Sequence, residues 1–253
     1  ANDLAAELTC AVAGSPRELS DAAEVVVTML ADDPSSASVH GGSNGLFTGS
    51  ARTFVEMGTM SPDHIVSLAE QAPAGTRIID APVSGATQAA ADAQLVIMAG
   101  CTPEDAAPLA PLFDAMGKKT LCLGQTGSGA VMKLAVNSLI HGINQTLAEA
   151  MTLAEAAGIA PDAAFDVIEA SAACAPMLKY RRLLYLDEAS HDVTFTVALA
   201  RKDMEVTADL ARKLGTDMPQ GLKTLEILKD AEMDGYAARD MASILNYMRE
   251  NKI

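Results

Sequence analysis

The sequence lacks tryptophan, and aromatic residues make up only 4% of its 253 positions. Hydrophobic residues nevertheless make up 49% of the chain, so a large core can form, and aliphatic side chains and the 13 methionines must fill it. Charged residues account for 20%, which excludes the composition of a disordered chain. The length fits one large domain or two moderate ones.

Basic residues are scarce. The chain has 18 Lys and Arg against 33 Asp and Glu, and its formal net charge is −15. Nucleic-acid binding requires a basic surface that faces the phosphates. The acidic balance therefore argues against a nucleic-acid partner, and it is otherwise typical of a surface that keeps a protein in solution.

The few cysteines and histidines form no metal-binding or disulfide pattern. None of Cys10, Cys101, Cys122 and Cys174 stands in a C-x-x-C pair, and no histidine lies at a ligand spacing from them. No apolar run approaches the roughly 18 residues of a membrane-spanning helix, and no secretory signal is visible. We therefore expect no metal and no membrane partner, with the cytoplasm as the default location.

The first half of the chain alternates strands and helices. Continuous apolar runs predict buried strands, and Ser-Pro or Thr-Pro pairs at residues 15, 61 and 102 predict helix starts between them, the first as a capping box with Glu18. This alternation indicates a mostly parallel α/β sheet. The predicted strands are Glu24–Leu30, Thr53–Met57, Arg77–Asp80, Leu95–Ala99 and Thr120–Leu123.

The second half contains only helical signals. Residues 130–157 form one periodic stretch, which as a helix would run roughly 40 Å, and Gly158 ends it. Further helices are expected from Pro161, from Pro219, over Phe195–Leu214 and over Arg239–Glu250. We therefore predict an α/β domain over residues 1–126 and an all-α domain over residues 127–253, joined by the long helix.

A narrow polar stripe marks this long helix. Lys133, Asn137, His141 and Asn144 recur at helical spacing on a segment that is otherwise apolar on most faces. A lysine on a buried helix must face a cleft, a ligand or a partner charge, where it can transfer protons. The alternative is a lysine that reaches past the helix end to water. For His141, a hydrogen-bonded core histidine is the favoured interpretation.

Two other segments carry polar groups that could serve chemistry. The turn Pro82-Val83-Ser84-Gly85 follows a predicted strand, at the edge where open α/β sheets bind ligands, although it is also compatible with an ordinary tight turn. The pair Lys202-Asp203 lies within the helix predicted over 195–214, and a solvated helix face is the favoured interpretation there.

Together these segments resemble a known family. Three motifs occur in this order: D-A-P-V-S-G at 80–85, G-x-G-x-x-x-K-x-x-x-N at 127–137 and F-x-x-x-x-x-x-K-D at 195–203. Their order and spacing resemble those of the β-hydroxyacid dehydrogenases, a family related to 6-phosphogluconate dehydrogenase. The resemblance covers the chain from about residue 8 onward. It implies a Rossmann-like first domain, NAD or NADP as cofactor, and hydride transfer involving a small β-hydroxy acid or its semialdehyde or keto-acid partner.

The resemblance also assigns roles to individual residues. Lys133 would be the general acid and base, and the substrate would be bound by Ser84, Gly85, Ala86 and Asn137. Cofactor contacts would come from Leu30, Ala31, Thr59, Phe195 and Lys202, while Asp203 would be mostly structural.

Several features depart from the family pattern. The first strand and its G-x-G-x-x-G turn are not in the sequence, which begins at Ala1 as if inside a helix, so we expect that an upstream segment was cut, processed or left out. Without that segment the choice between NAD and NADP stays open. Ala86 stands where a second glycine is frequent, and Gly58 where serine is frequent. Alanine at position 86 resembles the variation found in the semialdehyde and glyoxylate reductase branch of the family, which favours a substrate of that kind.

Two alternatives remain beside this hypothesis. One is a non-catalytic oligomeric or scaffold protein that retains the dehydrogenase fold, and the other is a related reduction of an imine or a phosphorylated sugar acid. The apolar helices of the second half, such as residues 148–157 and 241–248, further predict a homodimer or homotetramer assembled through residues after Gly129.

Overall fold

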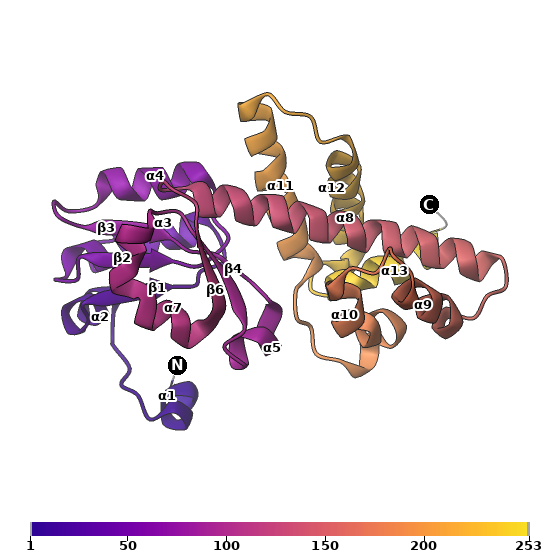
Figure 1. Cartoon of the computed structure of the whole chain (residues 1–253), viewed down its shortest axis with the longest axis horizontal. Coiled ribbons are helices and arrows are strands. Elements are labelled where there is room, and N and C mark those ends of the chain that lie inside the picture. The colour runs from indigo at the N-terminus through magenta and orange to yellow at the C-terminus, as the bar shows by residue number, and fades with distance from the viewer. Residues whose placement is uncertain (1, 252–253) are drawn as a thin grey trace. The chain divides into compact units, whose positions relative to one another are not determined.

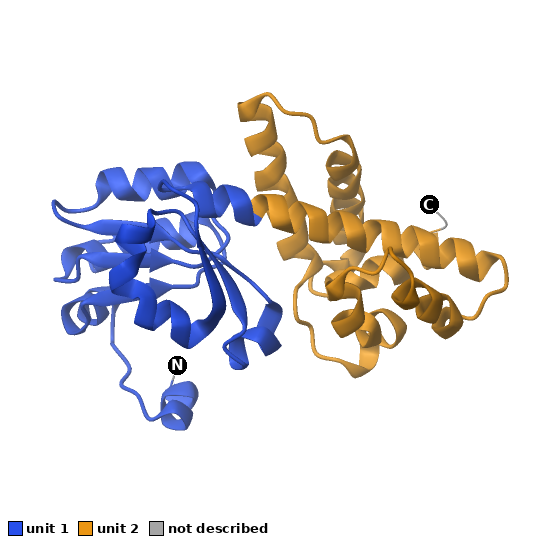
Figure 2. Ribbon diagram, in the orientation of Figure 1, with its two compact units in different colours: residues 1–133 blue, residues 134–253 orange. Residues whose placement is uncertain are grey.

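The computed structural model describes residues 2–251, and the chain divides into two compact units, Ala1–Lys133 and Leu134–Ile253 (Figure 2). The division falls inside a single helix, α8 (Ser128–Ala156), which is continuous across it. The sequence analysis placed the domain division a few residues earlier, after residue 126.

Unit 1 contains two three-stranded sheets (Figure 1). In the first, β1 (Val25–Thr28), β2 (Thr53–Glu56) and β3 (Arg77–Asp80) are parallel, with β2 in the centre. In the second, β5 (Leu95–Ala99) pairs in parallel with β6 (Gly117–Cys122) and antiparallel with β4 (Val83–Ser84). The predicted α/β class is confirmed. The sequence analysis missed β4, because two residues are too few to show periodicity, and placed the start of β6 three residues late.

Three helices of unit 1 begin where the Ser-Pro and Thr-Pro signals predicted. The hydroxyls of Ser15, Ser61 and Thr102 accept hydrogen bonds from backbone N–H groups three residues later, at 3.1, 3.1 and 3.2 Å. The capping box at residue 15 is only half formed, because the Glu18 carboxylate accepts from the Gly14 N–H rather than from that of Ser15. The helices are α1 (Asn2–Leu8), α2 (Pro16–Ala22), α3 (Asp33–Gly41), α4 (Pro62–Gln71), α5 (Ala86–Ala91), α6 (Pro103–Ala106) and α7 (Ala110–Met116).

Apolar residues pack on both faces of the sheet in unit 1. Because successive side chains of a strand point to opposite faces, Phe54 and Val55 of β2 belong to different clusters. Phe54 packs in a cluster with Ile65 of α4, and Val55 in one with Phe113 of α7. Both faces are therefore covered, as expected for parallel strands with continuous apolar runs.

Helices form the regular secondary structure of unit 2, and its described residues include one isolated bridge, between Thr196 and Asp240. One prediction about a helix end was wrong: the last helix begins only at Ile244, since Asp240 caps a short 3₁₀ turn at Met241–Ser243. Phe195 also lies just before its helix, which Thr196 caps. The helices after α8 are α9 (Pro161–Ala170), α10 (Pro176–Leu186), α11 (Val197–Leu214), α12 (Pro219–Ala231) and α13 (Ile244–Asn251).

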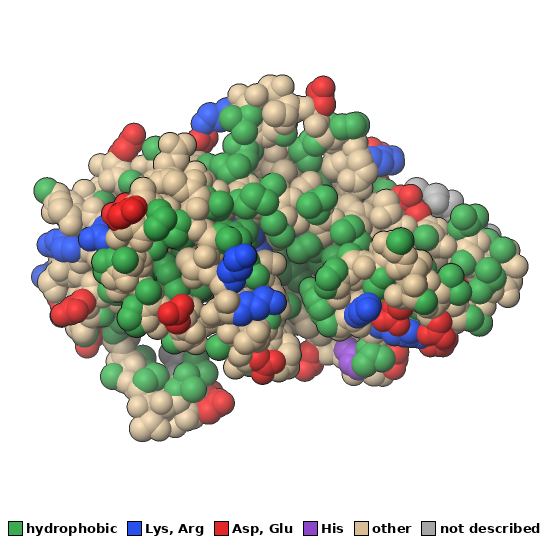
Figure 3. Space-filling model, viewed as in Figure 1, with side chains coloured by type: hydrophobic (Ala, Val, Ile, Leu, Met, Phe, Trp, Pro, Cys, Tyr) green, Lys and Arg blue, Asp and Glu red, His purple; other side chains and the backbone are tan. Residues whose placement is uncertain are grey.

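The core of unit 2 is built along the C-terminal half of α8. Met151 packs in one cluster with Phe165 of α9, Tyr185 of α10 and Met204 of α11. The expectation that α8 is buried on nearly all sides was wrong, because Leu139 is 67% exposed. Figure 3 shows hydrophobic side chains spread over the visible face of this unit. No helix within residues 2–251 has the length and apolar character that crossing a membrane requires.

A fully buried polar cluster joins α3 to the end of β2. The hydroxyl of Ser36 donates to Glu56 Oε2 at 2.7 Å, and His40 Nδ1 lies 2.9 Å from the Ser36 carbonyl oxygen, which requires hydrogen on Nδ1. His40 Nε2 faces Glu56 Oε1 at 3.9 Å. Burial raises the pKa of Glu56 to about 7, the charge of Asp33 adds to this rise, and the hydrogen bond from Ser36 opposes it. Burial lowers the pKa of His40, so the pair is neutral at mildly acidic pH.

This cluster predicts a pH-dependent stability. Between the ordinary pKa of 4.5 and about 7, Glu56 is ionised only in the unfolded state, so folding becomes less favourable as the pH rises. Each such pH unit costs about 1.4 kcal/mol, or on the order of 3 kcal/mol in all. Glu56→Gln should therefore raise the free energy of unfolding by roughly that amount at pH 8 and change it little at pH 4.5. Urea unfolding at both pH values measures the difference, and an equal effect at both contradicts the assignment.

Candidate active site

The carboxyl ends of β1 and β2 bring together three of the residues assigned to the cofactor. Leu30 and Ala31 follow β1, and Thr59 follows β2. The two loops touch, since a Cβ at Gly58 would lie 2.5 Å from the Leu30 carbonyl oxygen. This close approach accounts for glycine at position 58. Adjacent carboxyl ends of parallel strands are where open α/β sheets bind ligands.

Two successive residues of the Ser84 turn, Gly85 and Ala86, have positive φ angles, which favour glycine. Gly85 has φ 146°, and a Cβ there would lie 2.6 Å from the Ala89 Cβ. Ala86 has φ 58°, a left-handed conformation that is unfavourable for any residue with a Cβ. The frequent second glycine at this position therefore has a conformational reason. Ser84 itself is half-buried at the end of β4.

Lys133 is joined directly to this turn. It lies half-buried near the start of α8, and its Nζ donates to the carbonyl oxygen of Val83 at 2.7 Å. Val83 immediately precedes Ser84, so unit 1 places the assigned proton donor beside the assigned substrate loop. This contact favours a functional lysine over one that reaches past the helix end to water.

In unit 2, Asn137 and Lys202 meet at one carboxylate. Asn137 Nδ2 donates to Asp203 Oδ2 at 2.5 Å, and Lys202 Nζ lies 2.7 Å from Asp203 Oδ1. Asp203 is only 1% exposed, so the interpretation of this pair as a solvated helix face was wrong for Asp203. Since Asn137 follows Lys133 by four residues, both stand on the same face of α8.

The rest of the polar stripe serves packing. His141 is buried, and its ring lies 5.7 Å from that of Phe195 between centroids. Asn144 accepts from the Tyr185 hydroxyl at 2.7 Å and donates to the Met241 carbonyl oxygen at 3.0 Å. The core interpretation of His141 is therefore favoured, and Asn144 ties α8 to α10 and to the segment before α13.

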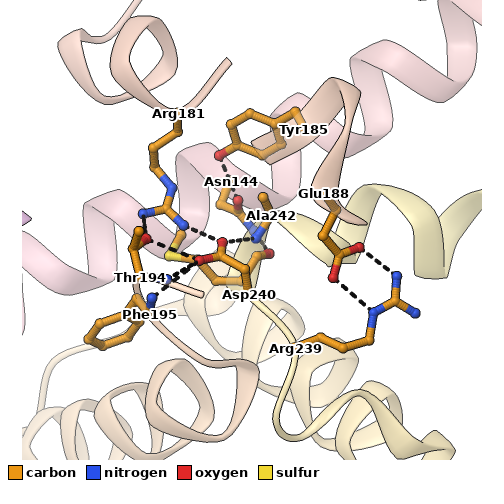
Figure 4. A network of polar contacts seen from close by, with 10 residues as sticks. Asn144, Arg181, Tyr185, Glu188, Thr194, Phe195, Arg239, Asp240 and Ala242 are labelled. Carbon is orange, nitrogen blue, oxygen red and sulfur yellow. Dashed lines mark hydrogen bonds and ion pairs between the residues drawn. The ribbon is translucent and has the colours of Figure 1, made fainter. Parts of the chain in front are cut away.

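Sequence reasoning missed a buried carboxylate that holds Phe195 (Figure 4). Asp240 Oδ2 accepts from the backbone N–H groups of Thr194 and Phe195 at 2.9 and 3.2 Å. Its Oδ1 accepts from the Ala242 N–H at 2.9 Å and pairs with the buried guanidinium of Arg181. Burial raises the pKa of Asp240, but these N–H donors and Arg181 outweigh it and lower the pKa overall. The N-cap position of Asp240 was readable from sequence, whereas nothing distinguished Arg181 from Lys179 and Arg182, the other basic residues of its helix.

Removing this carboxylate should destabilise unit 2. Asp240→Ala leaves the Arg181 cation buried without its counterion, and breaking such a pair typically costs about 3–5 kcal/mol. Urea unfolding should show this loss. The control is Asp209→Asn, which removes an exposed ion pair with Arg212 and should leave the free energy of unfolding nearly unchanged. Similar small effects for both variants would show that the network does not hold the segment.

The described residues contain no cluster of three or more His, Cys, Asp or Glu side chains that could hold a metal ion. Within unit 1, the side chains of Lys133, Ser84 and Thr59 are hydrogen-bonding groups suited to an organic acid and a nicotinamide cofactor.

Both parts of the chain match known protein families. Residues 1–124 match the family model described as the NAD binding domain of 6-phosphogluconate dehydrogenase. Residues 127–248 match the model described as NAD-binding of NADP-dependent 3-hydroxyisobutyrate dehydrogenase. The two models together cover nearly the whole chain.

Individual relatives extend the comparison. Glyoxylate/succinic semialdehyde reductase 2 of Arabidopsis thaliana is 27% identical over 94% of this chain and 67% of its own length. The 3-sulfolactaldehyde reductase of Escherichia coli is 28% identical over 94% of this chain and 80% of its own length. The crystal structure of a 3-hydroxyisobutyrate dehydrogenase from Salmonella typhimurium superimposes with a TM-score of 0.85 at 24% identity, covering 97% of this chain and 87% of that chain.

A dinucleotide-binding unit and a helical unit with these motifs define an oxidoreductase that uses NAD or NADP. The chain belongs to the β-hydroxyacid dehydrogenase family. The expected resemblance and fold class are thereby confirmed. The matches support the oxidoreductase hypothesis rather than the non-catalytic alternative.

Proposed function

We propose that the chain interconverts a small semialdehyde or keto acid and the matching hydroxy acid, with Lys133 as the general acid and base. The contact between Lys133 Nζ and the Val83 carbonyl oxygen carries this proposal, because it places an ammonium group next to the Ser84 turn. The named substrates of the Arabidopsis and Escherichia coli relatives each combine a carbonyl group with an acid group. A substrate of this chemistry needs an anion-binding group and a proton donor close together.

The Ser84 turn would bind the acid group of the substrate. The Ser84 hydroxyl and the Gly85 N–H both act as donors, and hydrogen bonds to a charged acceptor are about twice as strong as neutral ones. When bound, the reduced cofactor supplies the hydride. Lys133 donates a proton to the substrate's carbonyl oxygen as the carbon is reduced, and in the reverse direction the neutral amine takes this proton back.

The remaining residues would orient the reactants. Asn137 donates through its Nδ2 to Asp203, and its amide oxygen would accept a hydrogen bond from the substrate. Leu30, Ala31 and Thr59 would contact the cofactor from the carboxyl ends of β1 and β2, and Phe195 and Lys202 from unit 2. Both NAD and NADP remain compatible with these contacts. We further propose a semialdehyde or glyoxylate as the substrate, because alanine at position 86 resembles the semialdehyde and glyoxylate reductase branch of the family.

Replacing the proton donor should slow hydride transfer without unfolding the protein. Lys133→Ala is expected to lower the rate by about 10²-fold or more, the usual scale for loss of a positioned acid. The rate is measured as oxidation of the reduced cofactor in single turnovers of the full-length protein. Lys118→Ala, at an exposed position on β6, is the matched control and should have the wild-type rate. Unchanged turnover of Lys133→Ala removes Lys133 from the mechanism.

Replacing the substrate-binding hydroxyl should separate substrate binding from cofactor binding. Ser84→Ala should weaken binding of the acid substrate by on the order of 1–3 kcal/mol, because a hydrogen bond to a charged group is lost. The cofactor Kd should stay unchanged and serves as the internal control. An equal loss of affinity for both ligands would instead indicate that the turn has collapsed.

The exposed apolar helices of unit 2 support assembly into a homodimer or homotetramer through residues after Gly129. Leu153 of α8 and Val167 of α9 are 75% and 70% exposed, and hydrophobic side chains are visible over this unit in Figure 3. A symmetric interface above about 1,000 Å² would cover them. Light scattering at micromolar protein should give at least twice the chain mass of 26.2 kDa. A monomer at that concentration contradicts the assembly.

A further inference from the structure

Asp80 is the last residue of β3, and backbone groups surround its carboxylate. Its side chain is 1% exposed. Its Oδ1 accepts from the Gly127 N–H and its Oδ2 from the Ala130 N–H, each at 2.8 Å. A Cβ at Gly100 would lie 2.1 Å from Oδ1, and one at Gly129 would lie 2.9 Å from Oδ2. The glycines therefore allow the backbone to close around the carboxylate.

These N–H groups belong to the start of α8. The first N–H groups of a helix have no partner within the helix, and a capping side chain usually supplies one. The residue before Ser128 is Gly127, which has no side chain, so the acceptor comes from Asp80, 47 residues earlier in the chain. A carboxylate at this end also interacts favourably with the helix dipole.

The same two segments carry the assigned catalytic groups. Val83 and Ser84 follow Asp80 by three and four residues, and Lys133 lies near the helix start that Asp80 holds. The Lys133 Nζ then returns to the Val83 carbonyl oxygen at 2.7 Å. Three hydrogen bonds thus join the segment 80–84 to the segment 127–133, and Asp80 accepts two of them from backbone N–H groups.

We propose that Asp80 is the positioning residue of the reaction: its carboxylate fixes α8 against the β3–β4 segment and so holds Lys133 beside Ser84. This inference rests on the proposed role of Lys133. Asp80 is only 1% exposed, so we expect it to act through Lys133 and not by contact with a reactant. A shift of about 1 Å in a catalytic group can cost about 10²-fold in rate, so loosening this cap acts on turnover.

The chain contains a matched control on the neighbouring strand. Glu56 is the register partner of Asp80 across the β2–β3 pair, and it is equally buried. Its carboxylate is held by Ser36 of α3 and not by the backbone of α8. Asp80→Asn and Glu56→Gln therefore each replace a buried carboxyl group by an amide at the same edge of one sheet, and only the first affects the start of α8.

The test measures kcat and amide hydrogen exchange in the full-length protein. Asp80→Asn should lower kcat at saturating substrate and cofactor by at least about tenfold, since the amide turns a donor toward an N–H group. Exchange over residues 127–133 should become faster, and the KM for the cofactor should change less than twofold. Glu56→Gln should have wild-type kcat and exchange. A similar loss of kcat in both variants, or unchanged exchange in Asp80→Asn, contradicts the inference.

A double variant separates this inference from the proposed function. If Asp80 acts through Lys133, Asp80→Asn should cause no further loss of kcat in a Lys133→Ala background. A full additional loss there overturns the inference even if Lys133 is catalytic. If the Lys133→Ala variant alone turns over at the wild-type rate, the proposed function is overturned. Hydrogen exchange of Asp80→Asn over residues 127–133 then still tests whether Asp80 holds the start of α8. If Asp80→Asn does not fold, hydrogen exchange of the wild-type protein tests the cap instead. The Gly127 and Ala130 amides should then exchange slowly, and rapid exchange would show that Asp80 does not hold them.

Discussion

The start of α8 depends on a carboxylate that is distant in sequence. Asp80 accepts the Gly127 and Ala130 N–H groups inside a sheet edge where neither Gly100 nor Gly129 leaves room for a side chain. Burial raises the pKa of Asp80, and N–H donation from Gly127 and Ala130 opposes this rise. Lys133 lies in the second turn of the helix that begins here, and its Nζ donates to the Val83 carbonyl oxygen. If Asp80 positions Lys133 as we propose, this cap connects local backbone chemistry to the assigned function.

Unit 2 uses the same principle with different residues. A buried carboxylate, Asp240, collects the backbone N–H groups of Thr194, Phe195 and Ala242 and is neutralised by Arg181 (Figure 4). Buried charges are stable when every oxygen has a donor, and such sites resist movement of the segments they join. Both carboxylates thus hold loops at the ends of helices that carry assigned binding residues, while the carboxylates themselves are shielded from solvent.

Sequence patterns predicted the features that are local. The strand Arg77–Asp80, the helix starts after Ser61 and Thr102, and the polar side of α8 all depend on residues within a few positions of each other. The partners of Asp80, Asn137 and Arg181 lie 50, 66 and 59 residues away in the chain, so no periodicity or spacing could show them. Asp203 was misjudged for this reason, since it is buried and its partner Asn137 lies on another helix.

We propose above all that this family member reduces a small carbonyl compound that carries an acid group. The direct measurement compares succinic semialdehyde with butanal, an uncharged aldehyde of the same chain length, by following oxidation of NADH or NADPH in the full-length protein. The account predicts a kcat/KM at least about tenfold higher for the acid-bearing aldehyde, because one hydrogen bond to a charged group is worth that factor or more. Equal kcat/KM for the two aldehydes, or no oxidation of either cofactor by small acid-bearing aldehydes and keto acids, would contradict it.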